Sequence, residues 1–496
     1  MSDFDPSEYV TVPEGWSCKR LADCTVDGNI SYGIVQPGQY DESGIPIIRV
    51  NNVNNGQLDL KDVLKVSPAI EKKYARTRLK GGEVLLTLVG STGQSFVAPQ
   101  ELAGWNVPRA IAVIRADEEV GADWINICLQ SKETMHFLNV RANTTVQKTL
   151  NLKDVRDIPI LIPPKGVKES IESTVLSLSE KIELNRQTNQ TLEHIAQALF
   201  KCWFVDFEPT RAKMITKEKG ANTAIQELAA QAIICGAITL EQLEAITKNL
   251  ETTLQQAINE KLSQANQTPI NTEQLKTTAA LFPNVLVESE LGEIPEGWEV
   301  RQLPDVIDFL EGPGIRNWQY TEDDDGIKFI NIRCIKNGDL NLDTANKLTR
   351  EEAFGKYAHF QLGVDDIVVS SSGTLGRYAF VRSEHLPLSL NTSVIRFKKI
   401  YGVSTLHYIA GYVDTHLQWE LEMRASGSAQ RNFGPMHLKQ IEMLLPSLEI
   451  LESHNEQLDT LFRLRQSNLK ENDLLVNCRD ALLPKLLSGE LNVSGD

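Results

Sequence analysis

The 496-residue chain lacks the features that mark several common protein classes. Its seven cysteines are scattered, with no C-x-x-C pair and no cysteine and histidine cluster at zinc-finger spacing, which argues against a disulfide framework and a metal site. No run of about 18 apolar residues is present to span a bilayer, and the acidic, polar residues 1–5 are unlike a signal peptide. We therefore expect a cytoplasmic protein with reduced thiols and no bound metal.

The short motifs of common catalytic sites are missing as well. The sequence contains no G-x-x-x-x-G-K-[ST] phosphate loop, no H-E-x-x-H zinc motif and no G-x-S-x-G nucleophile elbow. The glycine-rich residues 309–314 only partly match a cofactor loop, because Pro313 interrupts them and no helical pattern follows. We expect neither a catalytic residue nor a cofactor site in this chain.

Positive charge is scarce. The chain has 50 Lys and Arg against 66 Asp and Glu, a net charge of −16, which on its face favours protein partners over nucleic acid. Residues 1–165 are nearly neutral, however, with 18 cationic and 20 acidic side chains. Within them, residues 71–80 gather five cations around Tyr74, enough to neutralise several DNA phosphates. The alternative is a solvated loop, which is the commoner fate of a charge run.

What the chain does have is a long internal repeat, with a period of 282 or 283 residues. Residues 12–16 (VPEGW) return as 294–298 (IPEGW), and residues 73–75 (KYA) return as 356–358. Further matches at this period are Gly90 and Gly93 with Gly373 and Gly376, and Asn185 and Asn189 with Asn468 and Asn472, and residues 113–115 (VIR) return 281 residues later as 394–396. Solenoid repeats have periods of about 20 to 50 residues, so each copy here is a whole domain.

Both copies show the same order of patterns. Short β-branched runs between Asn-Gly and Gly-Ser turns predict β-rich structure, and residues 122–140 and 404–423 predict helices. A long helical pattern follows, with apolar residues that step by threes and fours as in a coiled-coil seam. The seam includes Asn185 and Asn189 in the first copy and Asn468 and Asn472 in the second, which would fix the register.

These patterns predict an α+β fold with pseudo-twofold symmetry, in which two repeated, β-rich mixed α/β domains are separated by two long helices that pair with each other. An amphipathic helix lying on a globular core is the alternative for each long helix. The predicted parts are a first domain at 1–164, a first helix at 165–209, a helical connector at 210–290, a second domain at 291–446, and a second helix with a tail at 447–496. The connector has no counterpart in the repeat, and we predict a linker or docking surface there.

Four segments carry a family resemblance. They are residues 13–16, residues 182–192 running into 198–207, residues 288–298, and residues 482–491. Their content and order resemble the DNA-specificity (S) subunits of type I restriction-modification systems. The departure is the helical insert at about 221–266, which is longer than expected there and leaves the role of the connector open.

This resemblance implies a non-catalytic subunit with two target-recognition domains, each of which reads one half of a bipartite, asymmetric DNA site. The two helices would form an antiparallel coiled coil that sets the gap and docks two modification (methyltransferase) subunits. Those subunits would carry the S-adenosylmethionine and methylate adenine, and restriction (motor-nuclease) subunits would complete the complex. The alternative is a bivalent coiled-coil scaffold that binds two protein partners without nucleic acid, which the acidic charge favours.

The two copies differ most in polar loops where a DNA reader would differ. Arginine favours guanine edges, and asparagine or glutamine favours adenine. In the first domain we assign Lys72, Lys73, Tyr74, Arg76 and Arg78 to phosphates, and Asn51, Asn52, Ser91, Gln94, Gln147 and Lys148 to bases. In the second domain we assign Arg333, Lys356, Tyr357, Thr374, Arg377, Gln430 and Arg431 to DNA contact. The alternative for each is a turn residue that only caps and solvates.

Overall fold

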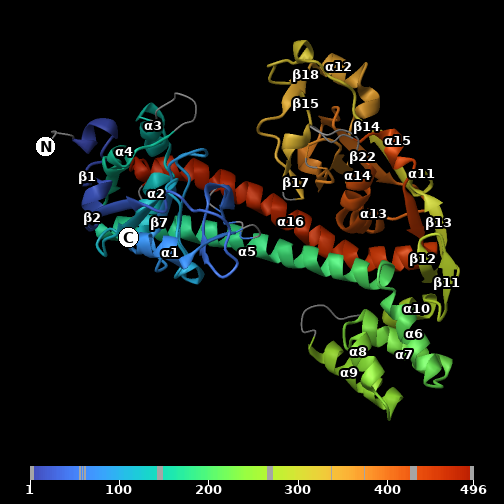
Figure 1. Ribbon diagram of the computed structural model, residues 1–496. Helices are drawn as coiled ribbons and strands as arrows, with labels where there is room; N and C mark the ends of the chain where they lie inside the picture. Colours follow the sequence, from blue (N-terminus) through green and yellow to red (C-terminus); the bar gives the residue numbers. More distant parts are fainter. Residues whose placement is uncertain are drawn as a thin grey trace. The chain divides into compact units, whose positions relative to one another are not determined.

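The computed structural model describes residues 5–54, 57–58, 60, 63–141, 149–264, 272–336, 338–373, 375–424 and 433–491. The chain forms two compact units, of which unit 1 is Met1–Leu184 with Glu471–Asp496 and unit 2 is Asn185–Lys470. Each unit combines one repeated domain with part of two long helices, α5 (Lys165–Phe204) and α16 (Leu448–Leu487), which are green and red in Figure 1.

The first repeated domain is built on a four-stranded antiparallel sheet. Its order is β2 (Thr25–Tyr32), β9 (Ile111–Ala116), β7 (Val84–Thr87) and β8 (Ser95–Val97). Successive side chains of a strand point to opposite faces. Leu86 and Ala112 therefore pack beneath helices α2 (Ala122–Leu129) and α3 (Lys132–Arg141), whereas Leu85 and Val113 pack into a second, smaller cluster.

Shorter elements complete the first domain. The paired strands are β1 (Ser17–Arg20) with β10 (Pro159–Ile162), β3 (Ile45–Ile47) with β6 (Leu64–Val66), and β4 (Val53–Asn54) with β5 (Gln57–Leu58). The short helices are η1 (Pro6–Tyr9), η2 (Leu21–Cys24), η3 (Val50–Asn52), α1 (Pro68–Glu71), η4 (Lys72–Thr77), η5 (Gln100–Leu102) and α4 (Leu152–Arg156).

The second repeated domain has the same central sheet. Its order is β14 (Ile307–Glu311), β22 (Val394–Lys399), β19 (Ile367–Ser370) and β20 (Tyr378–Phe380). The other strands are β15 (Ile327–Phe329) between β18 (Asn346–Leu348) and β21 (Leu388–Ser389), β16 (Ile335–Lys336) with β17 (Asp339–Leu340), and β13 (Glu299–Gln302) with β23 (Glu442–Leu445). The helices are α11 (Leu303–Val306), η6 (Asn317–Gln319), η7 (Ile332–Cys334), α12 (Arg350–Phe354), η8 (Ala358–Phe360), η9 (Ser383–His385), α13 (Leu406–Tyr412), the π-helical η10 (Val413–Leu417), α14 (Gln418–Arg424) and α15 (Pro435–Leu438).

The strand ladders correct one equivalence of the repeat. The sequence match pairs Arg115 with Arg396, but the β7–β9 and β19–β22 ladders place Arg115 where the second copy has Lys398. The ion pairs agree with the ladders. Arg115 lies 3.5 Å from the buried Glu83, and Lys398 lies 3.4 Å from the buried Asp366. The recurrence of the letters V-I-R is therefore a coincidence, displaced by two residues.

In unit 1 the first part of α5 pairs with the last part of α16. Val175 of α5 and Leu483 of α16 are buried in the same hydrophobic core. Further along α5, Lys181 Nζ lies 3.3 Å from a carboxylate oxygen of Glu471, which precedes Leu483 in the chain. Residue numbers rise along α5 while those of its contacts on α16 fall, so the two segments are antiparallel.

In unit 2 the remaining parts of the same helices pair in the same sense. Asn468 Nδ2 donates a hydrogen bond to Asn189 Oδ1 at 2.9 Å, and the His454 ring lies 5.4 Å from the Trp203 ring. The predicted α+β fold, with two repeated domains and an antiparallel helix pair, is confirmed. The four seam asparagines are nearly buried, with exposed fractions of 3% for Asn185, 6% for Asn189, 8% for Asn468 and 7% for Asn472.

The connector in unit 2 is a folded helical subdomain. It contains α6 (Glu208–Glu218), α7 (Thr223–Ile234), α8 (Leu240–Ala245), α9 (Leu250–Gln264) and α10 (Thr272–Leu281), and the hairpin β11 (Leu286–Ser289) and β12 (Gly292–Pro295) follows. Small residues such as Ala229 and Ala232 let α7 approach its neighbours, and Leu254 of α9 packs on them. Helix α10 reaches α16, where Gln274 donates to a Glu456 carboxylate oxygen at 3.0 Å.

Candidate nucleic-acid interface

The basic segment of the first domain is a helical turn that follows a buried carboxylate. Helix α1 ends at Glu71, and η4 carries Lys72, Lys73 and Arg76 outward as exposed side chains. Among the described residues these three side chains make no ion pair or hydrogen bond. Tyr74 is half-buried against a small apolar cluster, so it anchors the turn. Three free cations on one turn form a surface that suits phosphates.

Arg78 differs from the other cations because it is part of the framework. Its Nε donates to Glu71 Oε1 at 2.8 Å, and Glu71 is only 2% exposed. The Arg78 guanidinium, together with the Asn106 amide, holds the pKa of the Glu71 carboxyl below its usual value. Arg115 then donates to the carbonyl oxygens of Arg76 and Arg78 at 3.0 and 3.1 Å. The structure thus gives Arg78 a bracing role, beside its predicted phosphate contact.

The equivalent segment of the second domain presents fewer cations. Lys356 is exposed, and its ammonium group lies 5.0 Å from the centre of the Tyr357 ring. Tyr357 is 5% exposed, and its hydroxyl accepts a hydrogen bond from Gln319 Nε2 at 2.9 Å. The Tyr357 side chain is therefore a core residue whose polar atom is satisfied internally. Of the predicted pair, only Lys356 is placed to reach a phosphate in this structure.

Two equivalent 3-10 helices carry candidate base readers. In η3 the middle residue Asn51 is exposed, whereas Asn52 is 2% exposed and accepts a hydrogen bond from the Arg49 backbone at 3.0 Å. In η7 the middle residue Arg333 is exposed and Cys334 is buried. Asn52 therefore serves as a structural cap, which leaves Asn51 and Arg333 as the residues that point their polar groups to solvent.

Two equivalent hairpin turns carry the next candidates. The β7–β8 turn closes with Gly93 N donating to Thr87 O at 3.0 Å, and the β19–β20 turn closes with Gly376 N donating to Ser370 O at 3.2 Å. Gly93 and Gly376 have φ of 89° and 76°, a backbone conformation that favours glycine. Ser91 and Arg377 are exposed, and Gln94 is half-buried. The glycines thus shape the turns that present the polar side chains.

Five predicted contacts fall outside the described residues. They are Gln147 and Lys148 in the first domain, and Thr374, Gln430 and Arg431 in the second. Their assignment to DNA remains a prediction.

The glycine-rich residues 309–314 are explained by packing. A Cβ at Gly312 would lie 2.1 Å from the Asn391 carbonyl oxygen, and a Cβ at Gly33 in the first domain would lie 1.7 Å from the Val107 carbonyl oxygen. In both domains a glycine lets one segment cross the backbone of another at close range.

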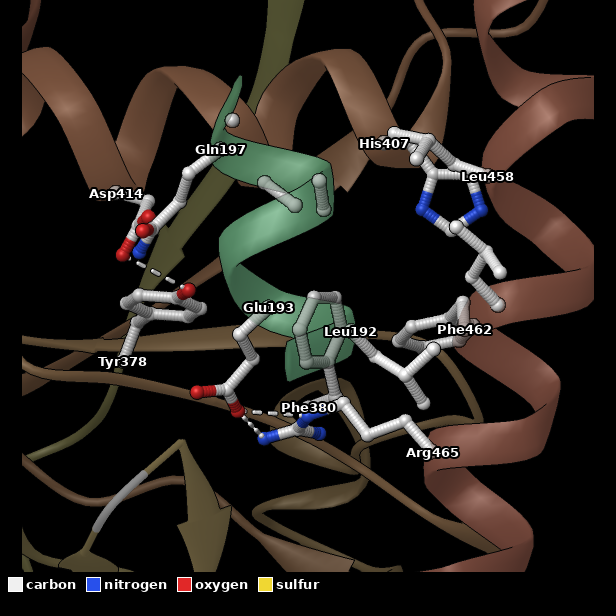
Figure 2. A pocket seen from close by; sticks show the side chains of 14 residues that line it. Leu192, Glu193, Gln197, Tyr378, Phe380, His407, Asp414, Leu458, Phe462 and Arg465 are labelled. Carbon is white, nitrogen blue, oxygen red and sulfur yellow. Dashed lines mark hydrogen bonds and ion pairs between the residues drawn. The ribbon is translucent and has the colours of Figure 1, made fainter. Parts of the chain in front are cut away.

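A mostly apolar pocket in unit 2, with a few polar side chains at its edge, lies between the second domain and the helix pair (Figure 2). Arg465 of α16 contacts Glu193 of α5 at 2.6 Å and also donates to the Gly338 carbonyl oxygen at 3.2 Å. On the domain side, Tyr378 donates to Asp414 at 3.0 Å, and burial followed by the Asp414 charge raises the pKa of Tyr378. In the sequence, Arg465 lies three residues before Asn468 on the seam of the second long helix, and a charged residue at that position is the signal that could have indicated this contact.

The histidine on the seam of α16, His454, is buried. His454 is 1% exposed among aromatic rings, including that of Phe204 at 4.8 Å, and burial lowers the pKa of His454 to about 3. The nearby His407 also has a lowered pKa, to about 4, because burial outweighs the charge of Asp459. Among the described residues no cluster of three or more His, Cys, Asp or Glu could hold a metal ion, and no helix is long and apolar enough to cross a membrane.

The chain is similar to proteins of one kind. A family model described as "Type I restriction modification DNA specificity domain" matches it twice, at residues 13–194 and 295–475. The type I restriction enzyme HindI specificity subunit of Haemophilus influenzae is 28% identical over 431 residues, which is 84% of this chain and 88% of the relative. The EcoBI specificity subunit of Escherichia coli is 26% identical over 238 residues, 46% of this chain and 50% of the relative. A crystal structure of an S subunit from M. genitalium aligns with 96% of this chain and 98% of its own, at 11% identity and a TM-score of 0.46.

Proposed function

Because the chain belongs to the family defined by the type I restriction modification DNA specificity domain, we propose that it is the specificity subunit of a type I restriction-modification complex. Each repeated domain reads one half of a bipartite, asymmetric DNA site. The observation that carries this proposal is the double match of the family model, once over each repeated domain. Two domains with one framework and different polar loops suit two unlike half-sites.

The local distribution of charge supports DNA as the ligand despite the acidic total. The exposed cations Lys72, Lys73 and Arg76 stand on one turn of the first domain, and Lys356 stands at the equivalent place of the second. Contacts to phosphates position a protein on DNA, and contacts to base edges specify the sequence. The partner subunits would supply further cationic surface, which makes a net charge of −16 tolerable.

The two long helices would set the gap between the half-sites. Each has 40 residues, so each spans about 60 Å at a rise of about 1.5 Å per residue. Half-sites one turn of B-DNA apart are separated by about 34 Å, a distance that helices of this length can bridge. Buried asparagines at the seam would fix the register and hence the gap.

The same helices would dock two modification subunits. Large apolar side chains on them are exposed, with exposed fractions of 57% for Leu184, 41% for Ile195, 47% for Leu464 and 62% for Leu474. The modification subunits would hold S-adenosylmethionine and perform the methyl transfer, and restriction subunits would join the complex as the motor and nuclease. In this proposal the present chain supplies sequence recognition and no catalytic group.

Selection from random duplexes tests the proposal. The chain is purified with its modification subunits, and the DNA molecules that the complex retains are sequenced. We expect two conserved blocks separated by a fixed number of unconserved base pairs. Retention of both protein partners with no enrichment of any DNA sequence would contradict the proposal and favour a bivalent scaffold that does not read nucleic acid.

A further inference from the structure

The two 3-10 helices η3 and η7 present one polar residue each at the same structural position. Asn51 and Arg333 are 282 residues apart, and each is the exposed middle residue of its helix. The preceding residues, Val50 and Ile332, pack against equivalent apolar clusters of the two domains. The backbone framework is therefore common to both domains, and the side chain that faces solvent is an amide in one and a guanidinium in the other.

The hairpin turns repeat this contrast. Gln94 and Arg377 are 283 residues apart, and each follows the glycine that closes its turn. The ladder of β7 with β8 matches the ladder of β19 with β20 residue for residue, so the two positions are structurally equivalent. Again the first domain presents an amide and the second presents a guanidinium.

The 3-10 helix and the hairpin turn are neighbours. In the second domain a Cβ at Gly373 of the turn would lie 3.3 Å from Ile332 Cδ1 of η7. In both domains the strand residue after the turn, Phe96 or Ala379, packs in the same cluster as the residue that precedes the reader on the 3-10 helix. The two polar positions of each domain therefore stand on one apolar cluster, and in the second domain the turn and the 3-10 helix are in direct contact.

The polar groups of these side chains are not used in contacts within the described parts of the domains. Among the described residues Asn51, Arg333 and Arg377 make no hydrogen bond or ion pair through their side chains. Gln94 Oε1 is buried and has no hydrogen-bond partner in the described part of the chain. The half-buried Gln94 side chain is therefore not held by a hydrogen bond at that oxygen, and a rotation towards solvent would present its carboxamide to the exocyclic amino group of adenine.

We infer that these four positions are base readers with opposite preferences in the two domains, so that Asn51 and Gln94 favour A·T pairs and Arg333 and Arg377 favour G·C pairs. The chemistry is that of the major groove. A guanidinium donates to both O6 and N7 of guanine, whereas a carboxamide accepts from N6 and donates to N7 of adenine. This inference rests on the proposed function, because it takes double-stranded DNA as the ligand.

The test is the same selection from random duplexes, performed with variant complexes. Arg333→Asn with Arg377→Gln should lower the preference for G·C pairs by about 5- to 150-fold at one or two positions of the second half-site, a range that corresponds to about 1 to 3 kcal/mol. The first half-site and the gap should not change. Asn51→Arg with Gln94→Arg should alter only the first half-site, towards G·C pairs.

Two controls separate base reading from charge and from folding. Arg377→Lys keeps the positive charge but loses the planar guanidinium, so it should weaken the G·C preference while the salt dependence of binding stays the same. Arg301→Gln removes an exposed arginine on β13 that pairs with Glu299, and it should leave both half-sites unchanged. Thermal melting of each complex identifies a variant that has failed to fold.

The outcomes distinguish this inference from the proposed function. If the wild-type complex selects a bipartite site and the folded arginine variants select the same second half-site, the inference is wrong and the proposed function stands. Weaker binding to all sequences alike would also overturn the inference, since it would identify the arginines as phosphate contacts. A wild-type complex that selects no sequence would overturn the proposed function itself.

Discussion

The basic turn of the first domain makes the most quantitative prediction. Lys72, Lys73 and Arg76 are exposed and make no internal ion pair among the described residues, so each is free to neutralise one phosphate. Each phosphate contact contributes about 0.9 to the slope of log K against log salt concentration. Replacing all three by alanine should therefore reduce the magnitude of that slope by about 2.7. If the variant and the wild type bind equally at about 1 M salt, the variant should bind about 500-fold more weakly at about 0.1 M salt.

The assay is a salt titration of DNA binding by the purified complex with modification subunits. It should be done on the selected site and on unrelated DNA, because the loss of phosphate contacts should lower the affinity for both equally. Arg78→Ala is a useful contrast, since it leaves the nearly buried Glu71 without its ion-pair partner and should lower the melting temperature. A triple variant that melts like the wild type and keeps its salt slope would remove the basic turn from the DNA interface.

Three further predictions concern the helices. Asn468→Leu should destabilise unit 2 by about 1 to 3 kcal/mol, because it leaves the buried Asn189 amide without its partner, and the double variant with Asn189→Leu should recover most of that loss in denaturant unfolding. Burial lowers the pKa of His454 to about 3, whereas the pKa in the unfolded chain is about 6.5, so the unfolded chain alone binds a proton between these values. The free energy of unfolding should therefore be constant above about pH 6.5 and fall as the pH falls towards 3, with a loss of about 2 kcal/mol at about pH 5. His454→Leu should reduce this dependence in thermal melts. Seven residues added to both α5 and α16 should widen the gap by about three base pairs, since they add about 10 Å, and an altered half-site with an unaltered gap would contradict the spacer role.

The repeat made the fold predictable, because two copies of one pattern test each other. Period-two alternation gave the strands of the central sheets, and the seam asparagines indicated the helix pair. The failure at Arg115 is instructive. A three-residue match displaced by two positions looked like an equivalence, and only the ladder with its buried Glu83 showed that Lys398 is the counterpart. Short sequence matches in strands do not define a register, whereas the strand ladders and the ion pairs to buried carboxylates do.

The candidate site was less predictable, since burial decides which polar residue can reach a ligand. Asn51 and Asn52 are neighbours of the same type, yet one is exposed and the other caps its helix from the interior. Tyr357 matched Tyr74 in the repeat but is more deeply buried. The fold of the connector was also hidden, because its helices form a core with no second copy to compare. Composition alone could indicate helices there but not how they pack.

Methylation mapping of a host that expresses this chain with its modification subunit tests the central claim most directly. The two-reader account predicts a single asymmetric motif, with two different conserved blocks, a methylated adenine in each and a fixed gap between them. A genome with no such motif, or with a motif that survives deletion of this chain, would contradict the assignment of sequence recognition to it.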